Sequence, residues 1–442
     1  MPETNRTKWL TRKTLLITLL TPPDAVSVLT IYLVLLFVIP SDRGIGALGG
    51  AGSVAGVFAL ATLLWWCWHH IQSPGSPRFG SPSPVRTAMF VFLGAVLASF
   101  AVASISALPA PDANAADLGL LRAGSFAGVL LVANDGIPDK ERFLTLMRRL
   151  ALLGGLYAAL GALQFYTGQS FTDAIQIPGL TTGQFEGVDA RGGFVRPEAT
   201  ARQPLEYAAV LTMLLPIALT LAIHDHKSAR LVRWFPVAAM TLAIFLSVSR
   251  SAFIGAVAVL AVLLPTWAPK VRRAAAWALA FAFVAVYVLV PGMVGTVLGL
   301  FTVRDASVDS RTDGYDIAGE FVAMNPLLGR GFGTFLPSYR ILDNQYVGML
   351  IELGAIGVVT FAAVLAVGAG VAFAGRRLHH DHIMTQMGPA LGASVLVSAL
   401  LAAFFDALSF AQAAGLMFLM SGLSGAYWHL GAPTRRIARE GA

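Results

Sequence analysis

The strongest constraint on the fold is a series of long apolar runs that recurs from one end of the chain to the other. Hydrophobic residues make up 56% of the sequence and charged residues only 12%, and the mean hydropathy is +0.70. Soluble globular domains carry about twice that share of charged residues, so this class is excluded. We expect an all-α, polytopic integral membrane helical bundle that forms a single domain over residues 1–442.

Twelve apolar stretches have the length of a membrane-spanning helix, which needs about 17 to 25 residues. Their centres lie near residues 32, 59, 97, 126, 158, 214, 242, 259, 283, 358, 396 and 420. The run between Arg233 and Lys270 is too long for one span, and Arg250 is its only charge. We therefore expect two spans there, with Arg250 at the turn between them, where it either serves a ligand or lies at the lipid headgroups.

The distribution of basic residues predicts the orientation of the bundle, because cytoplasmic loops collect Lys and Arg. With the N-terminus inside, 21 of the 31 basic residues fall on the cytoplasmic side. An even number of spans then places both terminal segments, residues 1–24 and 431–442, in the cytoplasm. The net charge of +7 reflects this bias, so the expected surroundings are membrane lipids and not nucleic acid.

Two long connections, residues 168–204 and 293–345, fall on the extracytoplasmic side. Long loops in a compact bundle are often functional. The first carries Arg191, Arg196 and Arg202 just before a predicted helix. Guanidinium groups beside a helix N-terminus can bind an anion. The same arginines could instead reach lipid headgroups or pair with nearby acidic residues, and the sequence leaves both readings open.

The second loop contains a predicted short helix, SRTDGYDIAGEFVAMNP, with Ser310 as its N-cap and its end at Asn325. We expect it to lie across the mouth of the bundle. Arg311 in its first turn either faces a ligand or pairs with a neighbouring Asp.

A glycine-rich stretch, PLLGRGFGTF, follows this helix and places Arg330 among Gly329, Gly331 and Gly333. Alternate glycines can bend the backbone into an anion-binding nest, although a plain turn explains the pattern equally well. It is not a Walker loop, because no Gly-Lys-Ser/Thr follows.

Two carboxylates, Asp343 and Glu352, lie at or just after the end of this loop, and a third, Asp406, lies in the short outer turn between the last two predicted spans. Asp343 lies at the predicted membrane surface, where it could act as a base or orient a substrate. Glu352 lies deeper in the next span, which favours a structural role with an arginine or a backbone group. Asp406 is expected to make a secondary polar contact.

The HHDH sequence at 379–382 lacks companion ligands, so neither a metal nor a cofactor is expected.

Four stretches, in order, resemble the superfamily of O-antigen ligases and O-antigen polymerases, bacterial membrane glycosyltransferases. They are GALQFYTG; RPEATARQPLEYAAVL; SVSRSAFIG; and RTDGYDIAGEFVAMNPLLGRGFGTF followed by LDNQYVGMLIELGAIG. Together they cover much of residues 161–357.

The resemblance implies a GT-C-like, metal-independent transfer of a glycan from a polyprenyl pyrophosphate carrier, on the outer face of the bacterial cytoplasmic (inner) membrane. It implies that Arg196 and Arg250 bind the donor pyrophosphate. We expect Asp343 to orient or deprotonate a hydroxyl of the acceptor, which is a glycan or a lipid. Further substrate-binding candidates are Arg191, Arg202, Gln203, Arg311, Arg330 and Asn344.

Two positions depart from the ligase pattern. Ligases of this group usually have histidine where this chain has Asp343, and similar sequences often have histidine at Gln203. The Asp-Asn pair resembles polysaccharide polymerases more closely. Two other functions remain open: a transporter or flippase of lipid-linked sugars, and a peptidoglycan polymerase of the shape, elongation, division and sporulation group.

Overall fold

A computed structural model describes residues 24–72, 82–172, 175–182, 190–191, 193–293, 295–296, 299 and 306–431. Its helices are α2 (Ala25–Val38), α3 (Val54–Gln72), α4 (Pro84–Ile105), α5 (Ala110–Asp135), α6 (Lys140–Thr167), α7 (Pro204–His224), α8 (Arg230–Leu246), α9 (Arg250–Leu263), α10 (Pro269–Leu289), α12 (Ala306–Met324), α13 (Gln345–Gly375), α14 (His382–Leu401) and α15 (Ala411–Leu430). Short 3-10 helices are η1 (Gly46–Ala51), η2 (Leu264–Thr266), η3 (Arg376–Leu378) and η4 (Ala407–Ser409).

Strands are confined, within this part of the chain, to two antiparallel pairs of two residues. Strand β1 (Arg43–Gly44) pairs with β2 (Thr181–Thr182), and β3 (Ala190–Arg191) pairs with β4 (Phe194–Val195). The first pair fastens the loop after α2 to the long loop after α6. The second forms a small hairpin inside that long loop. The prediction of an all-α polytopic membrane fold is therefore confirmed.

Every predicted span centre falls within a helix of the structure. Eight of the described helices are long and apolar enough to cross a membrane, and α2 and the α9–η2 segment are shorter apolar helices. The apolar run around Arg250 is divided as expected, because α8 ends at Leu246 and α9 begins at Arg250.

Ion pairs join the helix ends that the sequence assigns to the cytoplasm. The pairs are Arg86–Asp135, Lys140–Asp381, Arg142–Asp24, Arg148–Asp225 and Lys227–Glu141. They connect the starts of α2, α4, α6 and α14 with the ends of α5 and α7. At the opposite end, Ser41 after α2 donates to Glu206 at the start of α7 over 2.9 Å. For α2 and α7, the two ends thus lie on opposite faces of the bundle, as a membrane topology requires.

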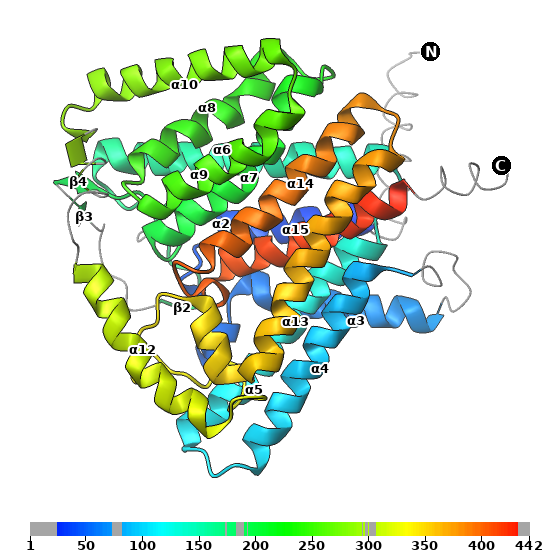
Figure 1. The fold of residues 1–442 in the computed structure, drawn as a ribbon, viewed down its shortest axis with the longest axis vertical. Coiled ribbons are helices and arrows are strands. Elements are labelled where there is room, and N and C mark those ends of the chain that lie inside the picture. Colours follow the sequence, from blue (N-terminus) through cyan, green and yellow to red (C-terminus); the bar gives the residue numbers. More distant parts are fainter. Residues whose placement is uncertain are drawn as a thin grey trace, which may run out of the picture.

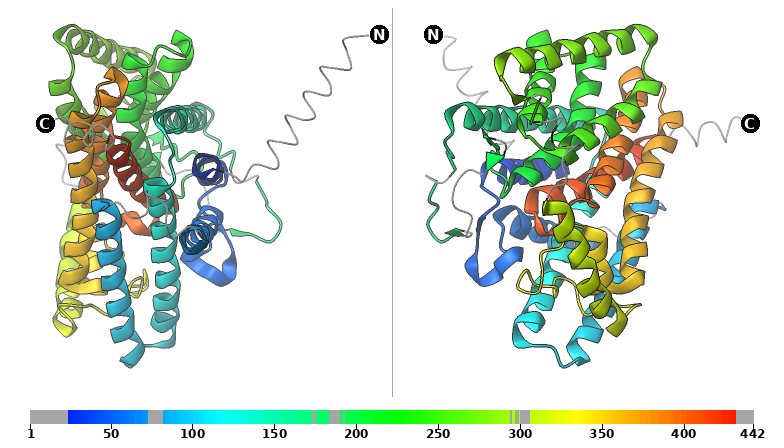
Figure 2. Two further views of the ribbon diagram at one scale, coloured as in Figure 1. Left: turned by 90° about the vertical axis from the view of Figure 1, so that its right-hand side faces the viewer. Right: turned by 60° about the vertical axis from the view of Figure 1, so that its left-hand side comes forward.

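Helices α7 and α15 form the centre of the bundle, whereas α10 lies at its edge (Figure 1). In the most apolar window of each helix, 83% of α7 residues are buried but only 6% of α10 residues. Trp277 and Phe281 of α10 are exposed at 77% and 76%. Such a surface suits contact with lipid tails. Helices α4, α5 and α13 run side by side in the other half of the molecule (Figure 2).

Helix α12 packs on the first turns of α13, where Ala318 meets Ile351 and Leu342 in a small apolar cluster. It ends at Met324, next to the predicted Asn325, but it begins at Ala306. Ser310 therefore lies inside the helix, and its prediction as the N-cap is wrong. The backbone of the preceding residues continues the helix toward the N-terminus.

Helix α13 is interrupted at Gly354, which has a φ of 65°. A Cβ atom there would lie 2.3 Å from the backbone carbon of Leu327, so only glycine fits. The interrupted backbone pairs with the glycine-rich loop: Ala355 N–H donates to the Pro326 carbonyl over 2.9 Å, and Gly331 N–H donates to the Glu352 carbonyl over 2.9 Å. The loop is thereby fixed against the helix.

Candidate functional site

A cavity of about 570 Å³ lies at the bundle end that carries the two long loops. Its wall comes from α5, the start of α7, loop residues 332–343, the first turns of α13 and residues 405–410. The ionisable residues in the wall are Arg122, Arg202, Arg340, Asp343, Glu352 and Asp406. Four phenylalanines also line it: Phe332, Phe335, Phe405 and Phe410. The structure thus brings the two long loops, the start of α13 and the α14–α15 turn to one cavity.

Asp343 lies in the cavity wall, and Asn344 caps the helix that follows. The Asn344 Oδ1 atom accepts from Tyr346 N–H over 3.0 Å and from Val347 N–H over 3.4 Å. A carboxylate at position 343 is therefore not the helix cap. The Asn344 side chain is engaged in α13 and is not among the residues that line the cavity.

Gln345 fastens the Asp343 segment to the turn that carries Asp406. Its backbone N–H donates to the Ala402 carbonyl over 2.8 Å. Its side-chain Oε1 accepts from Leu408 N–H over 2.6 Å, and the side chain is buried. These bonds hold the two carboxylate-bearing segments on the same side of the cavity.

Asp406 is partly buried and accepts a hydrogen bond from the Ser409 hydroxyl. Burial raises the pKa of Asp406, and the nearby charge of Asp343 adds to this increase. The Ser409 hydrogen bond and the Arg122 charge oppose the increase. Asp343, Asp406 and Arg122 are therefore close enough to influence one another electrostatically.

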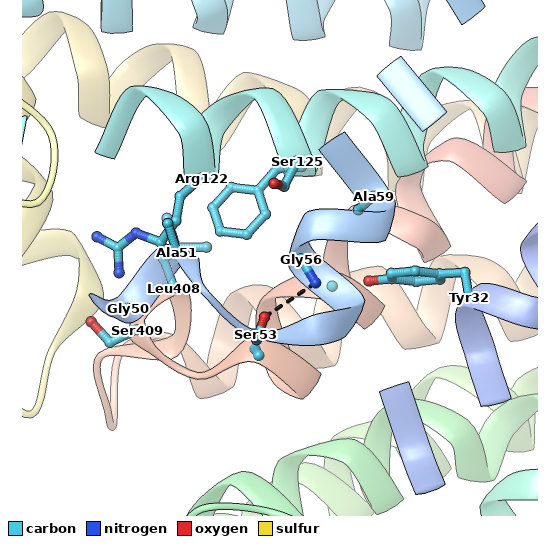
Figure 3. A pocket seen from close by; sticks show the side chains of 13 residues that line it. Tyr32, Gly50, Ala51, Ser53, Gly56, Ala59, Arg122, Ser125, Leu408 and Ser409 are labelled. Carbon is cyan, nitrogen blue, oxygen red and sulfur yellow. Dashed lines mark hydrogen bonds between the residues drawn. The ribbon is translucent and has the colours of Figure 1, made fainter. Parts of the chain in front are cut away.

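Arg122 is a functional candidate that the sequence reading missed. It projects from α5 with its guanidinium carbon 5.2 Å from the centre of the Phe332 ring, a cation–π distance. It also borders a smaller pocket of about 30 Å³ beside the main cavity. In Figure 3, Arg122 and Ser125 come from α5, while Tyr32 and Ser409 approach from other segments. The available signal was a lone charge in the apolar run between Asp117 and Asp135.

Arg202 and Gln203, both predicted to bind substrate, line the cavity at the start of α7. The buried Glu206 fixes this segment, because it accepts from Arg202 N–H over 2.8 Å and from Gln412 N–H over 2.7 Å. The Ser41 hydroxyl also donates to Glu206. The cavity rim is thus tied to α2 and α15, which suits a site that needs fixed geometry.

Arg196 and Arg250 lie apart from the residues that line this cavity. Arg196 follows the β3–β4 hairpin, and Arg250 is the first residue of α9. Phe194 packs against an apolar cluster that contains Val248, so the two arginine-bearing segments contact each other through their neighbours. The Nε atoms of both arginines are buried. The structure thus associates the segments of the predicted pair with one apolar cluster outside the cavity wall.

Gln164, from the GALQFYTG motif, positions the segment that follows Arg196. Its Oε1 accepts from Ala199 N–H over 2.6 Å, and its Nε2 donates to the Ala199 carbonyl over 3.0 Å. Ala199 has a φ of 52°, a backbone conformation that is unfavourable for a residue with a side chain. The two hydrogen bonds with Gln164 help to hold this conformation.

The backbone before Arg250 is also strained. Val248 has a φ of 46°, which is a genuine outlier for a β-branched residue. Its side chain is fully buried. On either side of Arg250, the Ser249 and Ser251 hydroxyls lie 2.9 Å apart. Strain of this kind persists where packing fixes it and is concentrated at functional sites.

Arg330 makes structural contacts. Its guanidinium forms a salt bridge with the buried Asp112. It also lies 4.8 Å from the Phe321 ring centre and 5.5 Å from that of Tyr339. Arg330 is not in the cavity wall. These contacts join the glycine-rich loop to α5 and α12 and give no support to its predicted role in substrate binding.

The glycine-rich loop and the residues after it donate backbone hydrogen bonds to a carboxylate of the protein itself. Glu352 accepts from Phe335 N–H over 3.2 Å and from the Gly333 backbone. The structural role expected for Glu352 is thus observed, although the residue also lines the cavity. The side chains of Arg191 and Arg311 lie outside the described residues.

These features define a multi-pass helical membrane protein with a charged cavity at one end of the bundle. Residues 235–362 match a family model described as O-antigen ligase, which confirms the resemblance carried by the third and fourth sequence stretches. The matched segment contains Arg250 and Asp343, whereas Arg196 and Arg202 precede it. No match was found among curated proteins. In the part of the chain that is described, no group of three or more His, Cys, Asp or Glu could hold a metal ion.

Proposed function

We propose that the protein is a metal-independent membrane glycosyltransferase that transfers or polymerises an oligosaccharide linked to polyprenyl pyrophosphate. The reaction takes place on the outer face of the bacterial cytoplasmic membrane, with both chain termini in the cytoplasm. The main support is the cavity that Asp343 lines together with Arg202 and Gln203 from the first long loop. The match to the O-antigen ligase family supports the same reaction class.

The donor pyrophosphate binds at Arg196 and Arg250. Both arginine residues are partly buried, and Arg250 begins a helix whose N-terminal N–H groups also favour an anion. Planar guanidinium groups match phosphate oxygens with two hydrogen bonds each and remain charged at a membrane surface. Because charge develops on the departing pyrophosphate, these fixed cations lower the barrier without a metal.

The acceptor hydroxyl enters the cavity at Asp343. Its oxygen attacks the anomeric carbon of the donor sugar, and the bond from that carbon to the pyrophosphate oxygen breaks. The bonding electrons leave with the pyrophosphate, and the hydroxyl proton passes to the Asp343 carboxylate. Arg202 and Gln203, at the cavity rim, bind the glycan between the two sites.

The acceptor is a glycan or a lipid. The O-antigen ligases that this chain resembles usually have histidine at the position of Asp343. The aspartate found here favours polymerisation of a glycan. The proton transfer itself is the same for either side chain.

Transport of a lipid-linked sugar is less well supported. Secondary transporters place broken helices and ionisable residues near the membrane midplane. The break in α13 at Gly354 lies in the outer third of that helix, and the loop at 326–331 satisfies its backbone. The charged cavity likewise lies at the end of the bundle.

Purified protein incubated with lipid-linked oligosaccharide from a strain that lacks the protein tests the proposal. Longer lipid-linked glycan, or glycan moved to a second acceptor, is the expected product, and EDTA should leave the rate unchanged. A protein that moves the intact lipid-linked sugar across a vesicle membrane without forming a new glycosidic bond is a transporter, and the proposal is then wrong.

A further inference from the structure

The cavity wall carries charged side chains of both signs and several aromatic rings. Arg122, Arg202 and Arg340 stand with three carboxylates. A strongly anionic group placed beside Asp343 and Asp406 would meet carboxylates of its own sign. Carboxylates that accept hydrogen bonds from hydroxyl groups, together with aromatic rings that cover an apolar ring face, are suited to a sugar.

Asp406 stands beside Asp343 in this wall as a second carboxylate with no role so far in the proposed reaction. Gln345 bonds to Ala402 and Leu408 and so keeps the two segments together. The Ser409 hydroxyl orients the Asp406 carboxylate through one of its two oxygens. A carboxylate has several lone-pair positions, so Asp406 retains acceptor capacity for a ligand.

We propose that Asp406 and Asp343 accept hydrogen bonds from two hydroxyl groups of one sugar ring in the cavity, so that the acceptor is an uncharged sugar residue of a glycan. This inference rests on the proposed function and specifies its acceptor. One hydroxyl is the nucleophile, and its proton passes to Asp343 as the new glycosidic bond forms. The other hydroxyl remains hydrogen-bonded to Asp406, which positions the ring.

Asp406→Asn tests this role because the amide keeps the shape but loses the charge. We expect KM for the acceptor to rise about tenfold or more, the usual effect of losing a charge-assisted hydrogen bond. KM for the lipid-linked donor should not change, and Asp406→Glu should recover part of the affinity. Asp117→Asn is the matched control, because Asp117 is exposed on α5 and does not line the cavity. A donor KM that rises equally, or an acceptor KM that stays constant, overturns the inference.

A binding measurement separates this inference from the proposed function. The probe is the oligosaccharide repeat of the host, released from its lipid carrier and titrated into purified protein without donor. Wild type should bind it, and Asp406→Asn should bind about tenfold or more weakly. Equal binding by the two proteins overturns the acceptor site even if transfer is observed. Wild type that binds the glycan but transfers nothing refutes the transferase and keeps the sugar site.

Ser409→Ala provides a second test that does not change the charge of the cavity. It removes the hydroxyl that orients Asp406 and should raise the acceptor KM in the same direction, by a smaller factor. An unchanged acceptor KM in both Ser409→Ala and Asp406→Asn assigns Asp406 a structural role and overturns the inference.

Discussion

Asp343 and Asn344 are adjacent in sequence but serve different parts of the structure. Asn344 caps α13 with its side-chain oxygen, and Asp343 lines the cavity. Asn344 therefore caps the helix, and Asp343 is left for the proposed proton transfer. The effects of substitution at the two positions should separate in the same way.

Asp343→Asn should abolish glycan transfer while thermal stability in detergent stays close to wild type, because an amide cannot accept the proton. Asn344→Ala should instead lower stability by about 0.5 to 2 kcal/mol, the usual effect of removing an N-cap. Transfer assays and thermal unfolding on both variants check this. An active Asp343→Asn variant would remove Asp343 as the base.

Lysine should not replace arginine at the proposed pyrophosphate site. Arg196→Lys and Arg250→Lys each keep the charge but lose the two-pronged hydrogen bonding to phosphate oxygens. Each lost charge-assisted contact is worth about 1.5 to 3 kcal/mol, which lowers transfer roughly ten- to a hundredfold. Arg230→Lys, exposed at the other end of the bundle, is the control and should keep full activity. Normal rates from both site variants would show that these arginines contact only headgroups.

Gln164→Ala should weaken donor binding, although Gln164 itself is not proposed to contact the donor. Gln164 makes hydrogen bonds to the backbone of Glu198 and Ala199, just after Arg196. Without them, the strained turn relaxes and Arg196 loses its fixed position, so KM for the donor should rise. Gln169→Ala, exposed after the same helix, should behave as wild type. An unchanged donor KM in the Gln164 variant would assign this residue to stability alone.

The sequence predicted those parts of the fold that depend on local hydropathy. Every apolar run became a helix, and the division at Arg250 followed from helix length alone. The start of α12 was wrong because a single N-cap signal, Ser310, is weak evidence when the preceding residues also favour a helix.

The cavity could be predicted only in part, because its residues come from segments far apart in the chain. Asp343, Arg202 and Gln203 were identified, since they stand beside predicted helix starts in the long loops. Arg122 was missed because it lies within an apolar span and only tertiary packing brings it to the loops. Arg330 was assigned to substrate because its partner, Asp112, lies on α5 and cannot be paired with it from sequence spacing.

Cysteine labelling in intact cells tests which bundle end faces the cytoplasm. The native Cys67 is exposed and is first replaced by serine. Cysteine in place of Ser338, in the cavity loop, should react with a membrane-impermeant thiol reagent. Cysteine in place of Ala229, between α7 and α8, should not, because basic loops remain inside. Labelling at position 229 and protection at position 338 would reverse the orientation.

Removing the charge of Asp406 should stabilise the protein in a manner that depends on pH. Burial and the charge of Asp343 raise the pKa of Asp406 above its ordinary value of 3.8. The folded state then holds its proton more tightly than the unfolded state. The stability that this tighter proton binding contributes is fully present below about pH 3.8. It is lost as the pH rises through the pKa of Asp406 in the folded state. Asp406→Asn does not titrate, so its advantage over wild type should grow from acidic to neutral pH.

Thermal unfolding in detergent at several pH values measures this difference, with Asp117→Asn as an exposed control that should show no such trend. Asp406→Asn is also expected to weaken acceptor binding. The wild-type Asp406 carboxylate would therefore lower stability at neutral pH while it serves the substrate. A constant difference in melting temperature across the pH range would mean that Asp406 ionises as readily in the folded protein as in the unfolded chain. The electrostatic coupling between Asp406 and Asp343 would then be too weak to matter for binding.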